Sequence, residues 1–314
     1  MDGILDAGRA FFDGLYSVEW SALALAVLCH LAKVAARTRA WRNIVQAAYP
    51  EANVRWRSVY GSYVAGVGVN ALVPARGGDV LRLYLLKHRV EGSTYPTLGA
   101  TLLVDTLFDT VLASLLVGWA LAFGFLPGLD VIPSLTPIDW LYLFQHPRAA
   151  ALVAIVLVVL ALAGITWGAR HVKDFWARVR QGFSILQRPR EYLRLVVLWD
   201  AVDWSLRLAS VYFFLKAFGL PEHVDNVALV QVTQSLSTAL PFTPGGVGTE
   251  QALLVYVFQG EAPTSALLSF SIGVKIVLTV VNVTIGFLAI LLMLKTFRWR
   301  DHVDRDPATS RRPS

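Results

Sequence analysis

Long apolar runs separated by short polar stretches dominate the sequence, and this pattern predicts membrane-spanning helices. A helix needs roughly 20 mostly apolar residues to cross the hydrocarbon of a bilayer. Five runs approach or exceed that length, at residues 20–36, 97–125, 149–167, 195–220 and 265–294. The pattern therefore predicts an all-α polytopic membrane protein with about five full spans.

Two further apolar runs are interrupted by prolines and glycines. One covers residues 59–73 and resumes at 80–86, and the other covers 227–240 and resumes at 251–258. Proline removes a backbone donor, glycine permits unusual backbone angles, and an unsatisfied backbone group is costly in lipid. We therefore expect two broken helices that lie inside protein or face a watery cavity. Their prolines and glycines are Pro74, Gly77 and Gly78, and Pro241, Pro244, Gly245, Gly246 and Gly248.

The positions of Lys and Arg orient the expected helices. Basic residues gather at 37–57, 170–194 and 295–312, whereas 126–147 contains no Lys or Arg and 222–225 carries acids. Cytoplasmic loops of membrane proteins carry an excess of Lys and Arg. This distribution predicts an N-terminus outside the membrane and a C-terminus in the cytoplasm.

The same charges predict that the broken helices are two oppositely oriented re-entrant hairpins. The first has Arg57 before it and Lys87 after it, so it enters and leaves from the cytoplasm. The second must be entered from outside if the last span is to finish inside. The order span, hairpin, span then occurs twice with inverted topology, an arrangement in which broken helices build a substrate site near the midplane. The expected organisation is one membrane domain at 1–298 (first half about 15–125, connecting span about 149–168, second half about 195–297) and a disordered cytoplasmic tail at 299–314.

Composition agrees with a membrane protein and excludes several other classes. The 314 residues are 55% hydrophobic and 16% charged, below the roughly 25% charged of soluble domains. The net charge of +6 falls in the predicted loops, so we expect no nucleic-acid partner. The single Cys29 rules out an internal disulfide, and the acidic first residues do not fit a cleavable signal peptide. Metal-ligand spacings and a phosphate-binding loop of the Walker type are absent, so no metal or cofactor is expected.

Polar residues around the two interruptions are candidate substrate contacts. Freed backbone N–H groups at the glycines, with Arg76 and Arg82 nearby, would suit a phosphate. The alternative is an Arg–Asp pair that closes the hairpin, and a pair of this kind can also open for a ligand. Lys275 lies well inside the last span and needs an acid such as Glu250 or a substrate anion. The candidate substrate-binding residues are Asn70, Pro74, Arg76, Gly77, Gly78, Asp79, Arg82, Pro241, Pro244, Gly245, Gly246, Gly248, Glu250 and Lys275.

Four further charged residues in the spans are candidates for gating or proton coupling. Asp105 and Asp109 share one helix face, so they could serve a proton-coupled step or pair with an arginine from a hairpin. Asp203 and Arg207 have the same spacing and most simply pair with each other. Asp200 lies one turn earlier on that face, as a possible additional ligand.

Both interruptions resemble signatures of the lysylphosphatidylglycerol synthase transmembrane-region family, also called flippase-like or UPF0104. The similarity covers about residues 15–297. The family's usual Glu-Arg-x-x-Asp appears here without its arginine, which leaves any role tied to that arginine open. The three motifs are Asn70-x-x-x-Pro74-x-Arg76-x-Gly78-Asp79-x-x-Arg82, Pro241-x-x-Pro244-Gly245-Gly246-x-Gly248-x-x-Gln251 and Asp105-Thr106-Leu107-Phe108-Asp109.

The resemblance implies an integral protein of the inner, cytoplasmic membrane that moves a lipid between leaflets. In two-part members this region is taken to translocate an aminoacylated lipid that a separate soluble domain makes. That soluble domain is missing here, so we expect no lysyl transfer. The expected function is a translocase for an anionic or phosphate-bearing lipid, of phospholipid or polyprenyl-phosphate type. The alternatives are a membrane enzyme or accessory subunit in polyprenyl-phosphate or aminoacyl-phospholipid metabolism, and a non-transporting partner of a separately encoded lipid synthase.

Overall fold

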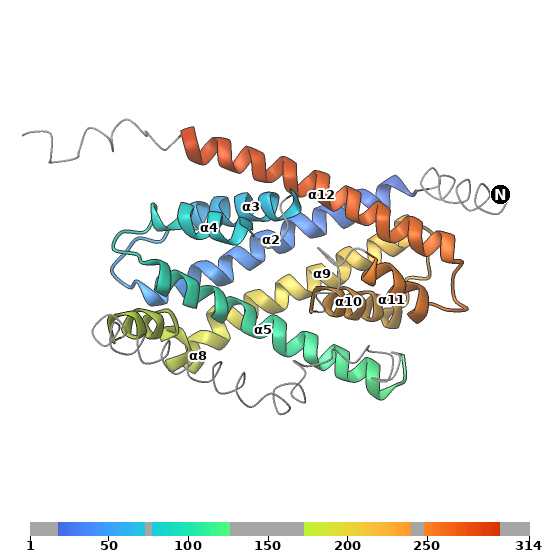
Figure 1. Ribbon diagram of the computed structural model, residues 1–314, viewed down its shortest axis with the longest axis horizontal. Helices are drawn as coiled ribbons and strands as arrows, with labels where there is room; N and C mark the ends of the chain where they lie inside the picture. The colour runs from blue at the N-terminus through green and yellow to red at the C-terminus, as the bar shows by residue number, and fades with distance from the viewer. Residues whose placement is uncertain (1–17, 73–76, 126–172, 240–247, 296–314) are drawn as a thin grey trace, which may run out of the picture.

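A computed structural model of the chain describes residues 18–72, 77–125, 173–239 and 248–295, and within these ranges it is helical with no strand (Figure 1). The expected all-α class is confirmed. The helices are α2 Trp20–Ala48, α3 Trp56–Leu72, α4 Gly77–Lys87, α5 Tyr95–Ala122, α8 Pro189–Tyr192, α9 Leu198–Ala217, α10 Val224–Ala239, α11 Thr249–Val257 and α12 Thr264–Lys295, with a helical segment at 173–182, a 3₁₀ turn η2 Ser184–Gln187 and a π-helical turn η3 Leu193–Val197.

Three of the described helices are long and apolar enough to cross a membrane: α2, α5 and residues Thr264–Met293 of α12. They correspond to three of the five expected spans. The expected span at 195–220 coincides with α9, which carries several charged residues and is not among these three helices. The expected connecting span at 149–167 and the tail at 299–314 lie outside the described residues.

Helix α2 is much longer than the apolar run that predicts it. The run ends at Ala36, but the helix continues to Ala48. Arginine is a good helix former, so the basic residues after Ala36 do not end the helix. Trp41 and Ile44 in this extension are fully buried. The interpretation of this stretch as a basic loop was therefore wrong, because side-chain charge was treated as a helix end.

Each interruption is flanked by two helices that pack against each other, α3 with α4 and α10 with α11. In the first pair the backbones approach very closely. A Cβ added to Gly66 would lie 2.6 Å from the carbonyl oxygen of Gly78, and one added to Gly78 would overlap the carbonyl oxygen of Gly66. Small residues that let helices approach in this way are common where membrane helices associate.

Helix α3 runs along the C-terminal half of α12. Gly61 lies against Met293, and a Cβ added to Gly68 would lie 2.7 Å from the Cα of Gly286. As α3 advances toward its end at Leu72, it therefore meets successively earlier residues of α12. This places the start of the first interruption level with the middle of α12.

Helix α11 lies along the other half of α12. Gln251 Nε2 donates a hydrogen bond of 2.8 Å to Ser271 Oγ, and Glu250 interacts electrostatically with Lys275. The start of α11, at the end of the second interruption, therefore lies beside residues 271–275 of α12, between its N-terminal end and its middle. The two helix pairs lie along opposite halves of α12, as Figure 1 shows.

The packing relations of the first half recur in the second. Two buried apolar clusters reflect this division. One lies mainly between α2, α3, α4 and α5, and the other mainly between α9, α10, α11 and α12. The most extensive contact, between α2 and α9, joins the first helix of each half. The corresponding contacts are α2–α3 and α9–α10, α3–α4 and α10–α11, α4–α5 and α11–α12, α2–α5 and α9–α12, and α3–α12 and α5–α10.

Candidate functional site

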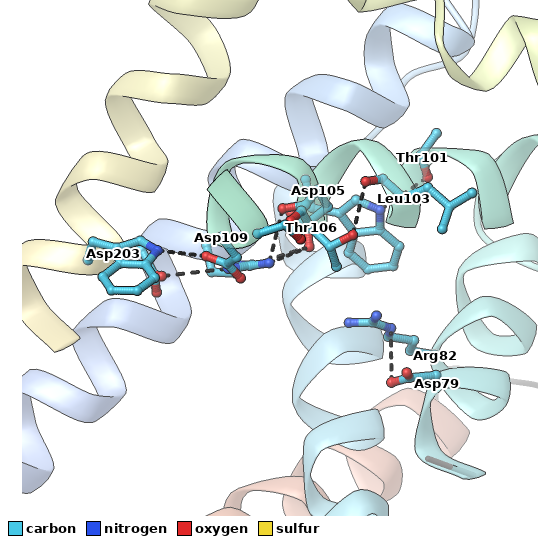
Figure 2. A network of polar contacts seen from close by, with 12 residues as sticks. Asp79, Arg82, Thr101, Leu103, Asp105, Thr106, Asp109 and Asp203 are labelled. Atoms are coloured by element: carbon cyan, nitrogen blue, oxygen red, sulfur yellow. Dashed lines mark hydrogen bonds and ion pairs between the residues drawn. The ribbon is translucent and has the colours of Figure 1, made fainter. Parts of the chain in front are cut away.

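A buried cluster of charged side chains joins α2, α5 and α9 (Figure 2). Arg37 of α2 donates from Nε and Nη2 to Asp105 Oδ2, at 3.2 and 3.1 Å. Its Nη1 donates to Asp109 Oδ2 and lies 3.7 Å from Asp203 Oδ2. Arg37 is 6% exposed and Asp105 is 1% exposed, so these charges are removed from solvent and depend on one another.

Arg207 extends the cluster along α9. Its Nη2 lies 3.2 Å from Asp203 Oδ2, which is the pairing that their spacing predicts, and 4.0 Å from Asp109 Oδ1. Trp204 Nε1 donates to Asp109 Oδ1 at 2.7 Å, and the Arg207 guanidinium lies 4.8 Å from the Trp204 ring centroid. The cluster therefore ties the first half of the chain to the second.

Arg37 is the functional candidate that sequence reasoning missed. Asp105 and Asp109 do pair with an arginine, but it comes from α2 and not from a hairpin. The family's arginine position holds Thr106, whose hydroxyl donates to the Leu103 carbonyl oxygen at 3.0 Å and does not join the cluster. The available signal was the spacing of His30, Lys33 and Arg37, which shares one face of a helix once α2 is known to continue.

At the first interruption, Asn70 organises the start of α4. Asn70 Oδ1 accepts from the Gly78 N–H at 2.7 Å, and its Nδ2 donates to Asp79 Oδ1 at 3.0 Å. Asp79 Oδ1 in turn lies 3.6 Å from Arg82 Nε. The Gly78 N–H that was expected to be open to a phosphate is thus taken by Asn70, and the alternative Arg–Asp pair is present. Pro74 and Arg76 lie outside the described residues, and Gly77 is the first residue of α4.

Arg82 lies beside two neighbouring aromatic rings, whose centroids are 6.2 Å apart. Its guanidinium carbon lies 5.4 Å from the Trp41 ring centroid and 5.3 Å from that of Tyr63. Within the described part of the chain, its Nε has no hydrogen-bond partner and its ion pair is with Asp79. Arg82 also interacts electrostatically with Asp105, so it adjoins the charged cluster. A planar guanidinium with an N–H group left unpaired suits an oxyanion such as phosphate.

At the second interruption, a glycine and a glutamine fix the start of α11. Gly248 has a φ of +90°, which other residues rarely adopt, and its N–H donates to Gln251 Oε1 at 2.7 Å. Glu250 interacts with Lys275 electrostatically and with Gln234 by a side-chain hydrogen bond. These groups form a second polar site on α10, α11 and α12. The remaining candidates there, Pro241, Pro244, Gly245 and Gly246, lie outside the described residues.

Replacing Gln251 with alanine is expected to destabilise the protein by about 1–2 kcal/mol, because both the Gly248 N–H and the Ser271 hydroxyl lose their partner. The measurement is the unfolding midpoint of the purified protein in detergent. Gln259→Ala is the matched control, since Gln259 is exposed. Equal midpoints for the two variants would show that Gln251 does not hold α11 to α12.

Within the described ranges, no three His, Cys, Asp or Glu side chains are arranged to hold a metal ion. The charged groups described above are the cluster around Arg37, the Asp79–Arg82 pair at the first interruption and the Glu250–Lys275 pair at the second. The candidates from the first interruption lie beside the α2–α5–α9 cluster through Arg82 and Asp105. The Glu250–Lys275 pair lies on different helices, at the other interruption.

Comparison with known proteins supplies the family. Residues 7–286 match the family described as the lysylphosphatidylglycerol synthase TM region. A UPF0104 membrane protein of Methanocaldococcus jannaschii is 26% identical over 195 residues, covering 61% of this chain and 79% of the relative. A UPF0104 membrane protein of Methanothermobacter thermautotrophicus is 24% identical over 241 residues, covering 66% of this chain and 67% of the relative.

A third relative carries an enzyme name. Glycosyltransferase AglD of Haloferax volcanii is 28% identical over 233 residues, covering 62% of this chain. The match spans only 36% of AglD. The match over residues 7–286, together with the all-helical fold and its apolar helices, identifies the chain as a multi-pass membrane protein of the lysylphosphatidylglycerol synthase TM-region family.

Proposed function

We propose that this protein is a translocase that moves an anionic or phosphate-bearing lipid headgroup between membrane leaflets. The observation that carries the proposal is that the two interruptions are approached along opposite halves of α12, with the end of α3 near its middle and the start of α11 beside residues 271–275. Broken helices that meet near the bilayer midplane form the substrate sites of transporters with inverted repeats. The recurrence of helix packing in the two halves supports the same reading.

In this proposal α3–α4 is a re-entrant hairpin from the cytoplasm and α10–α11 is one from outside. The full spans are α2, α5, the segment at about 149–168, α9 and α12. The basic residues at 37–57, 170–194 and 295–312 then face the cytoplasm of a cell with this protein in its inner membrane. The lipid-exposed surface would include the many exposed apolar side chains of α5 and α12, such as Leu103, Leu115 and Leu292.

Arg82 is the proposed contact for the headgroup phosphate, together with Arg76. Support comes from the Nε of Arg82, which has no hydrogen-bond partner among the described residues, and from the contact of its guanidinium with the rings of Trp41 and Tyr63. Asp79 holds Arg82 at 3.6 Å, a distance that leaves the pair weak enough to open for a phosphate. Glu250 and Lys275 would act as a second pair that opens as the headgroup passes.

The proposed gating residues are Asp105, Asp109, Asp203 and Arg207. They belong to helices of both halves: the three aspartates share Arg37 as a cation, and Arg207 pairs with Asp109 and Asp203. A relative movement of α9 against α2 and α5 would therefore have to rearrange these ion pairs. Closely packed interfaces of this kind switch between discrete arrangements, as alternating access requires.

The second candidate function is that of a membrane enzyme or accessory subunit acting on polyprenyl-phosphate lipids. The glycosyltransferase name of AglD favours this candidate. Since the match covers about a third of AglD, the shared part is also consistent with a lipid-handling region beside a separate catalytic one. A chemically altered lipid product would favour the enzyme, whereas unaltered lipid in the opposite leaflet would favour transport.

The test is leaflet exchange in reconstituted liposomes. A fluorescent phosphatidylglycerol and a fluorescent polyprenyl phosphate are placed in the inner leaflet, and an impermeant quencher reports their arrival outside. Each of Arg76→Ala, Arg82→Ala and Glu250→Gln is expected to slow exchange by roughly 10- to 100-fold, since each removes a charge-assisted contact. Membrane insertion is expected to be unchanged.

Arg188→Ala is the control for these variants, because Arg188 forms an ion pair with Glu191 in which both side chains are about half exposed. Wild-type rates in all three test variants would remove these residues from the site. Exchange no faster than in empty liposomes, with either lipid, would contradict the proposed translocase.

A further inference from the structure

A fourth carboxylate faces the charged cluster without taking part in its hydrogen bonds. Asp200, in the first turn of α9, is 0% exposed, and neither of its carboxylate oxygens has a hydrogen-bond partner among the described residues. The π-helical turn η3 directly precedes α9 and therefore lies just before Asp200 in the chain. Such turns are rare and frequently occur at functional sites.

The two arginines of the cluster already pair with other carboxylates. Arg37 and Arg207 between them hold Asp105, Asp109 and Asp203, three carboxylates for two guanidinium groups. Asp105 Oδ1 is itself without a hydrogen-bond partner in the described part of the chain. Among the described residues, Asp200 itself forms no ion pair with either arginine.

Several charged groups act electrostatically on Asp200. They are Asp105 and Asp109 of α5, Arg37 of α2 and Asp203 of α9 itself. Tyr192 of α8 is half-buried and interacts electrostatically with Asp200 from the side of the preceding turn. Three carboxylates and one already paired arginine therefore surround it, so a negative charge on Asp200 would be both desolvated and repelled.

From this arrangement we propose that Asp200 is a proton-binding site that couples lipid movement to a proton gradient. A buried carboxyl without a cation is stabilised when it binds a proton, which removes its charge. The coupling half of the proposal rests on the proposed translocase function, whereas proton binding at Asp200 does not.

Loss of that proton would change the ion pairs that connect the two halves. An ionised Asp200 competes for Arg37, whose Nη1 group bonds Asp109 and approaches Asp203. Withdrawal of Arg37 toward Asp200 weakens these contacts and favours a different position of α9 against α2 and α5. The step transfers one proton from the Asp200 carboxyl to water and breaks no other covalent bond. Proton binding thus biases a two-state element, as in other charge-driven switches.

The first experiment measures proton binding directly, by infrared pH titration of the purified protein in detergent. We expect a protonated-carboxyl band that disappears in Asp200→Asn, whose amide resembles the neutral acid in shape. Asp225→Asn is the matched control, because Asp225 is an exposed aspartate in the first turn of α10. Asp200→Ser provides a second neutral variant should the asparagine protein fail to fold. A band that persists in a folded neutral variant overturns the proposal.

The second experiment measures coupling in liposomes with fluorescent phosphatidylglycerol and an imposed pH difference. The wild-type leaflet distribution should shift by up to about tenfold per pH unit for one coupled proton. This shift should be lost in Asp200→Asn and kept in Asp225→Asn. A distribution that follows a sodium gradient instead, or a wild-type distribution that ignores pH, overturns the coupling. Absence of wild-type exchange contradicts the translocase itself, and the infrared result still decides proton binding.

Discussion

Arg37→Ala is expected to destabilise the protein by about 3–5 kcal/mol, the cost of removing one partner from a buried ion pair. Arg37 bonds both Asp105 and Asp109 and approaches Asp203, so its loss leaves Asp105 without an ion pair among the described residues, while Asp109 and Asp203 keep Arg207. The uncompensated negative charge is largely buried, where water cannot screen it. The measurement is the unfolding free energy in detergent with increasing denaturant.

Two further variants distinguish the loss of the Arg37 charge from the loss of its hydrogen-bonding geometry. Arg39→Ala removes an exposed arginine from the same helix, one that stacks on Trp56 at 4.3 Å, and should cost less than about 1 kcal/mol. Arg37→Lys keeps the charge but loses the planar fork that bonds two aspartates, so its stability should fall between the two. An Arg37→Ala protein as stable as Arg39→Ala would show that the cluster does not hold α2, α5 and α9 together.

Gly78→Val is the second variant for which we expect a large loss of stability. It should destabilise the protein by about 1–3 kcal/mol or more through overpacking. A Cβ on Gly78 would overlap the carbonyl oxygen of Gly66. Because the obstacle is backbone and not a flexible side chain, α3 and α4 must separate. That separation also breaks the Asn70 contacts to Gly78 and Asp79, so we expect leaflet exchange to fall together with stability.

Gly99→Ala is the control for this variant. Gly99 also lies within a helix, α5, but a Cβ there meets no atom within 4 Å. Alanine in a helix interior is favoured over glycine by roughly 0.5–1 kcal/mol, so this change should be neutral or stabilising. If Gly78→Val and Gly99→Ala unfold at the same denaturant concentration, the close approach of α3 and α4 is not needed for folding.

Local pattern predicted helix positions well where hydrophobicity and helix length coincide. The runs expected at 97–125 and 265–294 correspond to α5 and α12 within a few residues. The run at 20–36 predicted the start of α2 but not its end, because an arginine can continue a helix and be buried by remote partners. Burial of Arg37 is decided by Asp105 and Asp109, about 70 residues away in the chain, and by Asp203.

The sequence pointed to candidate residues at the interruptions through their proline and glycine content, but the structure gives some of these residues a different role. Proline and glycine composition predicted where helices break, and α3, α4, α10 and α11 begin or end at those places. Gly78, however, is placed by its contact with Gly66, and its N–H is used by Asn70. A glycine spacing cannot distinguish a free anion site from a close helix contact, since both need the same missing side chain.

The sequence by itself determined the all-α class, the apolar helices long enough to cross a membrane and the two interruptions, because helix length, apolar content and proline chemistry are local properties. Only the tertiary structure decided which charges meet. Arg37 is shared by Asp105, Asp109 and Asp203, while Asp200 faces the same cluster without a hydrogen bond among the described residues. These pairings depend on how α2, α5 and α9 pack, and packing between remote helices is set by the shapes of whole surfaces.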